Sequence, residues 1–400
     1  MITRRAAQAA CGAAWAFVQL APAAAAADFS PIVVNGGTDA DINAAIQLAE
    51  RATHRTPPKV GGSTWSVQAP LVVLRGVFDV RAPIRMPAAL RIRAEGAVLN
   101  CRALPPEAFA FDGVGWRCEI AGSMSLVAAP NGIRWNTGTL SNNLTLGMSR
   151  IEGVHFAGVR GVAIDLQCRS SVVVIERCIF DSTSKVLHDR MCDDVAMVHC
   201  FVSGSRPPSV TPITLEYGRL TIRGGVFTPS VAAKTAAMLS WIEIVNEPPG
   251  ATSREQMLLC DGVRFGGEFG GIAVVTNRAA GRTNYPGGPG VCITLRNLHA
   301  SNTPNGADRS AAGEATGPLV LLEKVPNHVL IEGCYGVVKP SRLVDFLPGV
   351  DAASLVSKYS TKGIHNRFTL HLQRHNTLPP GSEAPPELQR FVVGPAAELP

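Results

Sequence analysis

Charged residues are scarce in this chain of 400 residues, at 17%, whereas hydrophobic residues make up 46%. That balance excludes a disordered chain, because disorder requires low hydrophobicity and a high charge content. Aromatic residues amount to only 6%, which is low for a sugar-binding β-sandwich. The formal net charge of +6 is weak and scattered along the sequence, so nucleic acid is not an expected partner.

The sequence has no pair of cysteines with the C-x-x-C spacing, which argues against a zinc site, and no metal ligand is assigned. Of its ten cysteines, Cys11 lies in the N-terminal segment, so an odd number remains in the rest of the chain. If a single disulfide forms, Cys101 and Cys118 are the expected pair.

Long apolar runs are also missing, so we expect no membrane span. Residues 1–27 resemble a cleaved export signal. Arg4 and Arg5 precede an apolar stretch, and small residues up to Ala27 offer cleavage sites before Asp28. These features predict a periplasmic or secreted protein.

A six-residue pattern recurs along the middle of the chain. Its seven copies read IEGVHF from Ile151, IERCIF from Ile175, MVHCFV from Met197, IRGGVF from Ile222, CDGVRF from Cys260, LRNLHA from Leu295 and IEGCYG from Ile331. The first four start 24, 22 and 25 residues apart, the length of one compact turn of a β-solenoid, and the later steps of 38, 35 and 36 residues need inserted loops.

A second apolar strand follows each copy, for example Val162–Leu166 and Ile213–Leu215. Residues 39–53 are predicted to form a helix with one apolar face that covers the first turn. The predicted fold is all-β: a single-stranded right-handed parallel β-helix with an N-terminal capping helix. Its expected parts are a signal (1–27), the cap (28–60), the β-helix (61–345), and a C-terminal strand pair with a Pro-rich tail (346–400).

Two segments resemble a known family. Residues 39–49 are similar to the opening helix of pectate-lyase-superfamily domains, and residues 76–87 with 90–99 resemble the strands that follow it there. The resemblance implies a right-handed parallel β-helix that acts on polysaccharides. The catalytic signatures of polygalacturonases and alginate epimerases are absent as sets, and the calcium-lyase pattern is not clearly present, so the resemblance implies no mechanism.

Polar residues of the second strand are expected to stack into a ladder. Side chains one turn apart lie about 4.8 Å from each other in such a fold. The candidate catalytic residues are Asp165, His188, Asp189, Arg190 and Glu216. Carboxylates one turn apart would suit a retaining glycosidase, and two turns apart an inverting one. A lyase would instead use Arg190 or Lys185 as the base, with carboxylates holding Ca²⁺ against the substrate; no other cofactor is expected.

The candidate substrate-binding residues are Glu243 on the ladder and Arg278, Arg282 and Tyr285 in a long polar loop. Three hypotheses remain open. The first is an enzyme that cleaves or modifies an acidic polysaccharide as a lyase or glycoside hydrolase. The second is a non-catalytic protein that binds such a polymer during its synthesis or export. The third is a structural solenoid whose ladder is polar only because water reaches it. The oligomeric state is not predicted.

Overall fold

The computed structural model of the protein describes residues 30–56, 66–68, 70–136, 147–168, 171–205, 210–230, 240–246, 255–266, 273–281, 290–301, 318–334, 342–361, 367–373 and 382–393. The chain divides into two compact units, Met1–Ser30 and Pro31–Pro400, and the second is the one described below. The predicted export signal lies outside the described residues.

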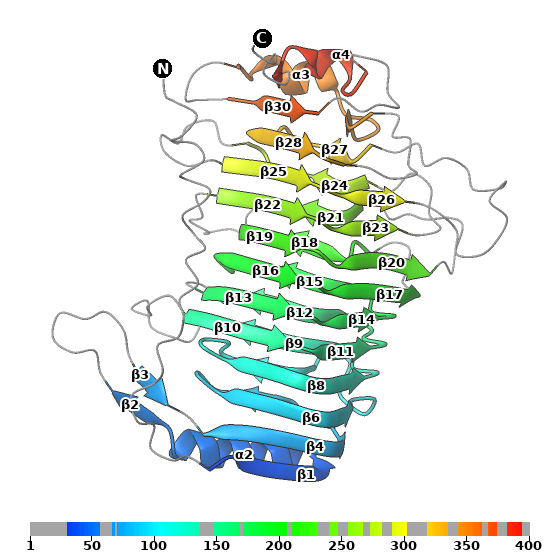
Figure 1. The fold of residues 1–400 in the computed structure, drawn as a ribbon. Coiled ribbons are helices and arrows are strands. Elements are labelled where there is room, and N and C mark those ends of the chain that lie inside the picture. Colours follow the sequence, from blue (N-terminus) through cyan, green and yellow to red (C-terminus); the bar gives the residue numbers. More distant parts are fainter. Residues whose placement is uncertain are drawn as a thin grey trace. The chain divides into compact units, whose positions relative to one another are not determined.

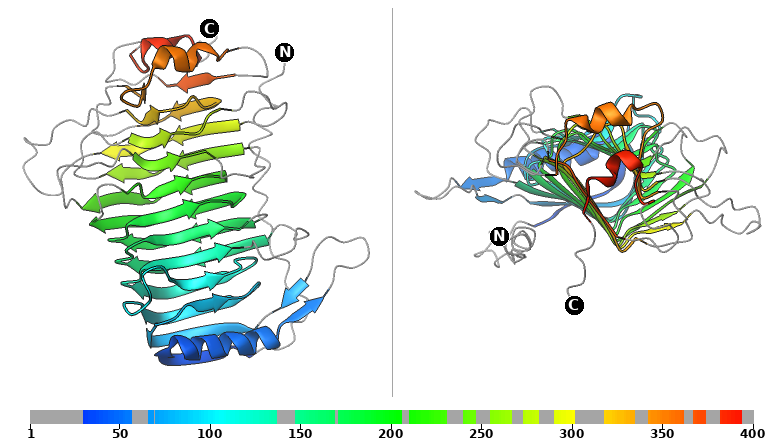
Figure 2. Two further views of the ribbon diagram at one scale, coloured as in Figure 1. Left: turned by 180° about the vertical axis from the view of Figure 1, so that it is seen from behind. Right: turned by 90° about the horizontal axis from the view of Figure 1, so that it is seen from above.

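The second unit is all-β, and its two large sheets are built from parallel strands (Figure 1). In Figures 1 and 2 the strands lie one above another in sequence order, an arrangement compatible with a parallel β-helix. Two short strands, β2 (His54–Thr56) and β3 (Ser66–Gln68), form a separate antiparallel pair.

The larger sheet has nineteen strands. They are β1 (Ile32–Thr38), β4 (Leu71–Asp79), β6 (Arg91–Asn100), β8 (Glu119–Val127), β10 (Gly147–Glu152), β11 (Val154–Ala157), β13 (Ser171–Glu176), β14 (Ile179–Asp181), β16 (Asp194–Val198), β17 (Phe201–Ser205), β19 (Gly218–Arg223), β20 (Val226–Ser230), β22 (Glu255–Asp261), β23 (Arg264–Gly266), β25 (Gly290–Arg296), β26 (His299–Ser301), β28 (His328–Glu332), β30 (Thr369–Leu372) and β31 (Val392–Val393).

The second sheet has ten strands. They are β5 (Ile84–Met86), β7 (Phe109–Gly113), β9 (Asn131–Asn136), β12 (Val162–Gln167), β15 (Lys185–Asp189), β18 (Ile213–Leu215), β21 (Ser240–Ile244), β24 (Ala273–Asn277), β27 (Val320–Leu322) and β29 (Val344–Phe346). From β10 onward the chain adds two strands to the larger sheet and then one to the ten-stranded sheet before the pattern recurs. We call one such set a layer.

The first residues of the six-residue repeats form one internal column. Ile151 pairs with Ile175, Ile175 with Met197, and Met197 with Ile222. All four side chains are buried. The prediction that residues about two dozen positions apart become neighbours inside the stack is therefore confirmed.

The third repeat position forms the corner between the two strands that each layer gives to the larger sheet. Arg177, His199 and Asn297 there have φ of 51°, and Gly153 has φ of 68°. Only glycine adopts this left-handed conformation without cost, and Asn tolerates it better than most residues. The backbone N–H of Arg177 donates to Val198 O and that of His199 to Arg223 O, so the corners are bonded from layer to layer.

Helix α2 (Asp39–Arg51) begins where predicted and ends two residues earlier. Its carboxylate of Asp41 accepts hydrogen bonds from the backbone and side chain of Thr38 at 2.8 and 2.9 Å, which stabilises the first turn and lowers the pKa of Asp41. One face buries Ile42, Ala45, Ile46 and Ala49, as the sequence predicts.

The predicted bridge between Cys101 and Cys118 is wrong, because both are buried free thiols. Cys101 follows the end of β6, whereas Cys118 precedes the start of β8. Since β6 and β8 are parallel neighbours, the two thiols lie at opposite ends of the pair. Their Sγ atoms donate to the backbone oxygens of Leu99 and Pro87 instead, and burial raises both pKa values to about 12.

The C-terminal part differs in detail from the expected strand pair and tail. A single strand, β30, continues the larger sheet there, and β31 pairs with it. Helices α3 (Ala352–Ser357) and α4 (Pro386–Gln389) lie in the same region. Leu388 and Phe391 are buried, so this segment adds to the core.

Candidate functional site

The outer face of the ten-stranded sheet carries a column of polar side chains. Successive register partners on neighbouring strands make up this column, which we call the outer ladder: Asp112, Arg134, Asp165, His188, Thr214, Glu243 and Thr276. The residues flanking it on each strand, such as Ile164 and Leu166, are buried in the core. The predicted ladder of polar residues on one face therefore exists.

The pairing within this ladder differs from the predicted one by one residue. Asp165 pairs with His188, and Asp189 pairs with inward Leu166 and Leu215. The Asp189 side chain accordingly faces the interior and is completely buried. Its predicted stacking on Asp165 is wrong, and a catalytic role for it remains a prediction that this orientation does not favour.

His188 connects the other candidate catalytic residues. Arg190 Nε donates to His188 Nδ1 over 3.2 Å, and His188 Nε2 lies 2.5 Å from Glu216 Oε1. Because Nδ1 accepts, this geometry assigns the imidazole proton to Nε2, from which it is donated to Glu216. Arg190 Nε also lies 3.0 Å from Asp165 Oδ1 in an ion pair. Four of the five predicted catalytic residues, Asp165, His188, Arg190 and Glu216, thus form one connected group.

Lys185 reaches the same face from the start of β15. Its Nζ donates to Thr214 Oγ1 over 2.8 Å. Burial lowers the pKa of the Lys185 ammonium and nearby Arg190 adds to the effect, whereas the carboxylates of Glu243 and Glu216 oppose it. A lysine held this way exchanges its proton more readily than an exposed one, which is a property of general bases.

Sequence reasoning named Lys185 only as an alternative base and missed its partner Thr214. Strand alternation counted back from inward Leu187 would turn Lys185 inward. The N–H groups of Val186 and Leu187 both donate to Pro212 O, at 2.8 and 3.2 Å, and this irregularity accompanies the outward placement of Lys185. No local sequence signal reveals such an irregularity.

Two of the four predicted substrate-binding residues can be placed. Glu243 belongs to the outer ladder, and Arg278, which follows β24, pairs with it at 2.8 Å and with Glu323 at 3.5 Å. Arg282 and Tyr285 lie outside the described residues. Along this face, then, acidic and basic groups alternate over several layers.

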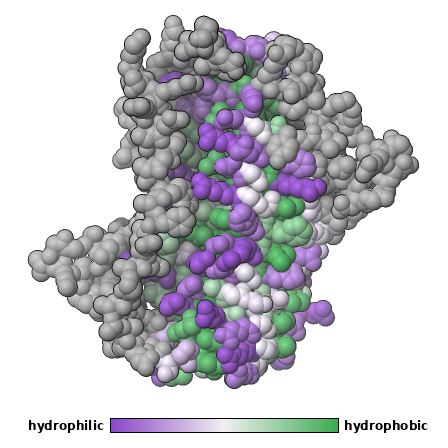
Figure 3. Space-filling view, in the orientation of Figure 1, coloured by the Kyte–Doolittle hydropathy of each residue, from purple (hydrophilic) through white to green (hydrophobic). Residues whose placement is uncertain are grey.

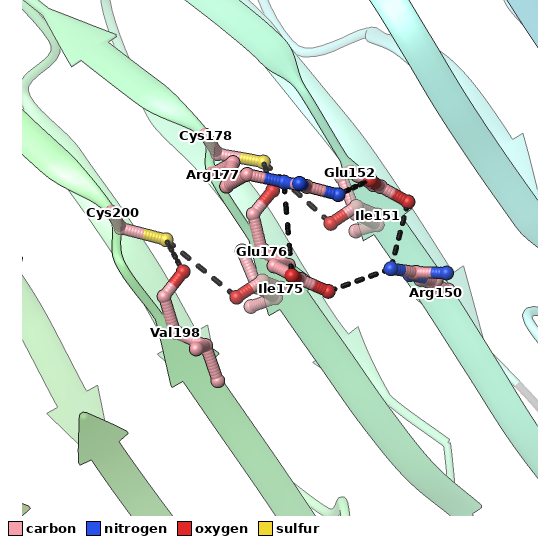
Figure 4. A network of polar contacts seen from close by, with 9 residues as sticks. All are labelled: Arg150, Ile151, Glu152, Ile175, Glu176, Arg177, Cys178, Val198 and Cys200. Atoms are coloured by element: carbon pink, nitrogen blue, oxygen red, sulfur yellow. Dashed lines mark hydrogen bonds and ion pairs between the residues drawn. The ribbon is translucent and has the colours of Figure 1, made fainter. Parts of the chain in front are cut away.

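A second charged network lies on the larger sheet. Figure 3 shows polar and apolar side chains intermingled over the described part of the face it draws. Figure 4 shows Arg150 between Glu152 and Glu176, with Arg177 reaching back to Glu152. The thiols of Cys178 and Cys200 point instead to the carbonyl oxygens of Ile151 and Ile175. This network holds no base of altered pKa, and surface ion pairs of this kind contribute about 0–1 kcal/mol each.

Among the described residues, no group of three or more His, Cys, Asp or Glu side chains is arranged to hold a metal ion. The ladder acids are bonded to Arg or His side chains, so they do not fit the Ca²⁺ that a lyase interpretation allows. Within the same residues, no helix is long and apolar enough to cross a membrane.

No protein-family model, curated protein or solved structure matches this chain. The site must therefore be interpreted from its own chemistry.

Proposed function

We propose that the second unit is a single-stranded right-handed parallel β-helix of the pectate-lyase type, with α2 covering its first layer. The in-register parallel pairing of successive layers supports the solenoid. Hydrogen bonds from the backbone N–H groups of Arg81 and Arg85 to Asp39 and Asn43 support the covering role of the helix. Export to the periplasm or medium is part of the same proposal and rests on residues 1–27 alone.

The function we propose is modification of an acidic polysaccharide on the outer ladder, by β-elimination. The observation that carries it is Lys185, a partly buried lysine whose pKa is lowered beside Arg190 and His188. In β-elimination a base removes the proton from the carbon next to the sugar carboxylate. The bond to the glycosidic oxygen on the adjacent carbon then breaks, a carbon–carbon double bond forms, and the oxygen takes up a proton.

The residues present can divide these tasks. The Lys185 amine is the proposed base, and the Arg190 guanidinium, 42% exposed, is placed to pair with the substrate carboxylate. The Nε2–H of His188, directed at Glu216, is the nearest described proton donor to this pair. Each role is a proposal for a group with known contacts, and none uses a metal ion.

Hydrolysis is the weaker alternative on this face. A glycoside hydrolase needs one carboxylic acid that holds a proton and a second carboxylate across the sugar. Asp165 faces the Arg190 guanidinium, and Glu216 accepts from His188. Asp189, the acid whose pKa is strongly raised by burial, lies inside the core, where no substrate reaches.

A panel of acidic polysaccharides tests the proposal. Absorbance of the unsaturated product near the ultraviolet edge reports β-elimination, and new reducing ends without that absorbance report hydrolysis. We expect unsaturated products from at least one polymer. Reducing ends alone would replace the lyase by a hydrolase.

Replacing the base gives the first specific prediction. Lys185→Gln should lower turnover by about 100-fold or more, because general base catalysis contributes 10²–10⁴-fold. In the parent protein, turnover should rise with pH through a value below the ordinary 10.5 of lysine, as the amine loses its proton. Lys358→Gln, which removes a lysine from the end of α3, serves as the control. Equal turnover of the two variants would exclude Lys185 as the base.

Non-catalytic binding is the second candidate function. It is favoured by the fact that Arg134, Arg190 and Arg278 each already face a carboxylate of the protein. The same panel decides between the two: retention of a polymer with neither product would establish binding and exclude the lyase.

A further inference from the structure

The cations of the outer ladder are matched one by one to acids of the protein. Arg134 Nη2 lies 2.5 Å from Asp112 Oδ2, and Arg278 Nε lies 2.8 Å from Glu243 Oε1. Arg190 faces Asp165 at 3.0 Å. Of the four cations on this stretch, Lys185 is the one whose described contact, Thr214 Oγ1, is a neutral oxygen. A substrate carboxylate therefore meets uncompensated positive charge mainly at one layer.

The layers next to Lys185 carry negative charge on both sides. Asp165 lies one layer before β15, Glu216 one layer after it, and Glu243 two layers after it. Neighbouring layers are about 4.8 Å apart, so these carboxylates lie within about one Debye length of Lys185. Anions placed opposite them along the stack would be repelled, whereas neutral hydroxyl groups could accept hydrogen bonds from the same arginines or donate to the same acids.

We infer that the polymer accepted by the outer ladder is sparsely charged: its acidic sugars are separated by neutral ones, and one acid is placed at Lys185. This inference rests on the proposed function and specifies its substrate class. The polymer runs along the stack, since the polar side chains extend over successive layers and not across one. Repulsion from Asp165 and Glu243 excludes chains with a carboxylate on every sugar, which is specificity by unfavourable contacts to the wrong ligand.

Binding to three polymers tests this order. Hyaluronan has one carboxylate per two sugars, polygalacturonate has one per sugar, and dextran has none. At equal sugar concentration and low ionic strength, simple attraction to a chain of net charge +6 would favour polygalacturonate. We expect the reverse in affinity electrophoresis, with hyaluronan bound about tenfold more tightly than polygalacturonate and dextran hardly retained.

The outcomes separate this inference from the proposed function. Tighter binding or faster cleavage of polygalacturonate would overturn the sparse-charge inference and leave polysaccharide modification standing. Equal retention of dextran would also overturn it, because charge would then play no part. Failure to bind or modify any acidic polymer would overturn both.

A pair of matched variants identifies the source of the discrimination. Glu243 and Glu152 have side chains 21% and 18% exposed, and each pairs with an arginine, at 2.8 and 2.9 Å. Glu152 lies on the larger sheet (Figure 4), away from the outer ladder. Glu243→Gln should improve polygalacturonate binding about three- to tenfold and change hyaluronan binding little. Glu152→Gln, with the same change of net charge, should leave the ratio unaltered.

Thermal melts of both variants establish that each is folded. If Glu243→Gln and Glu152→Gln shift the ratio equally, the preference reflects overall charge and the inference is wrong. If Glu243→Gln is folded and the ratio stays at its parent value, the ladder carboxylate does not exclude dense charge and the inference is equally wrong.

Discussion

Asp189 is a carboxyl group held entirely inside the stack. Its Oδ1 accepts the backbone N–H of Cys192 at 2.9 Å, and its Oδ2 has no hydrogen-bond partner among the described residues. Burial raises the pKa of Asp189 well above its ordinary value. The folded protein therefore keeps this proton at a pH where the unfolded chain has lost it, so the group favours folding most in acid.

The Asp189→Asn variant tests this residue. The benefit of the protonated acid is complete below about pH 4 and is lost as the pH rises toward the raised pKa of the folded state. The stability of Asp189→Asn relative to the parent should therefore increase between about pH 4 and pH 8, by up to about 1.4 kcal/mol per pH unit. Urea unfolding at both ends of this range measures it, with Asp181→Asn as a control for the lost charge. A difference independent of pH would show that Asp189 titrates normally in the fold.

At the scale of elements, the pairing of β28 with β30 brings two histidines together. The rings of His328 and His371 are 5.0 Å apart, and His328 Nδ1 lies 2.8 Å from Thr369 Oγ1. Burial, then His371 and Arg367, lower the pKa of His328 to about 4. The neutral ring is thus the form that the last layers accommodate.

Acid should loosen this pair of strands first. A lowered pKa means that the stabilising effect is present above about pH 6.5 and is lost as the pH falls toward 4, with an upper limit of about 3 kcal/mol. Hydrogen exchange at pH 7 and pH 4.5 should show β30 losing protection before β13. His328→Gln should reduce the difference, whereas His155→Gln on β11 should not. Uniform loss along the whole stack would contradict a local origin.

At the scale of the whole molecule, stability depends on a stack in which each layer contacts its neighbours. Ile175 lies in the internal column between Ile151 and Met197, fully buried. Parallel rings of Phe156 and Phe180, 4.9 Å apart, continue the same packing on the next strands. A cavity in one layer removes contacts from the two beside it.

Ile175→Ala should accordingly lower the free energy of unfolding by about 2–5 kcal/mol, the usual cost of a cavity at a buried aliphatic residue. Val174→Ala, one residue away on the outer face, should cost less than about 1.5 kcal/mol, because that side chain is partly exposed. Chemical denaturation of both variants measures the difference. Equal losses would mean that Ile175 does not carry the packing of the column.

Much of the architecture was predictable because it depends on local periodicity. The spacing of Ile151, Ile175 and Ile222 determines the internal column, and the 3.6-residue pattern of Ile42, Ala45, Ile46 and Ala49 determines the buried face of α2. The preference for glycine or a polar residue at the third repeat position was visible as well. Its cause, a positive φ at each corner, came from the structure.

The candidate site was predictable only in part. Asp165, His188, Arg190 and Glu216 were correctly expected on one face, while Asp189 was wrongly added and Lys185 was left outside the main group. The error is one residue of strand register, and a shift of one residue turns a side chain from one face of a sheet to the other.

The amino-acid sequence by itself determined which segments become strands, where they recur and which side chains are apolar enough to fill the interior. Only the tertiary structure decided that His188 stands beside Asp165, that Lys185 reaches Thr214, and that Cys101 and Cys118 remain apart. The physical reason is that strand identity follows from neighbours in sequence. The partner of a side chain across layers depends on backbone hydrogen bonds, such as the shared contact at Pro212, that form only when distant segments pack together.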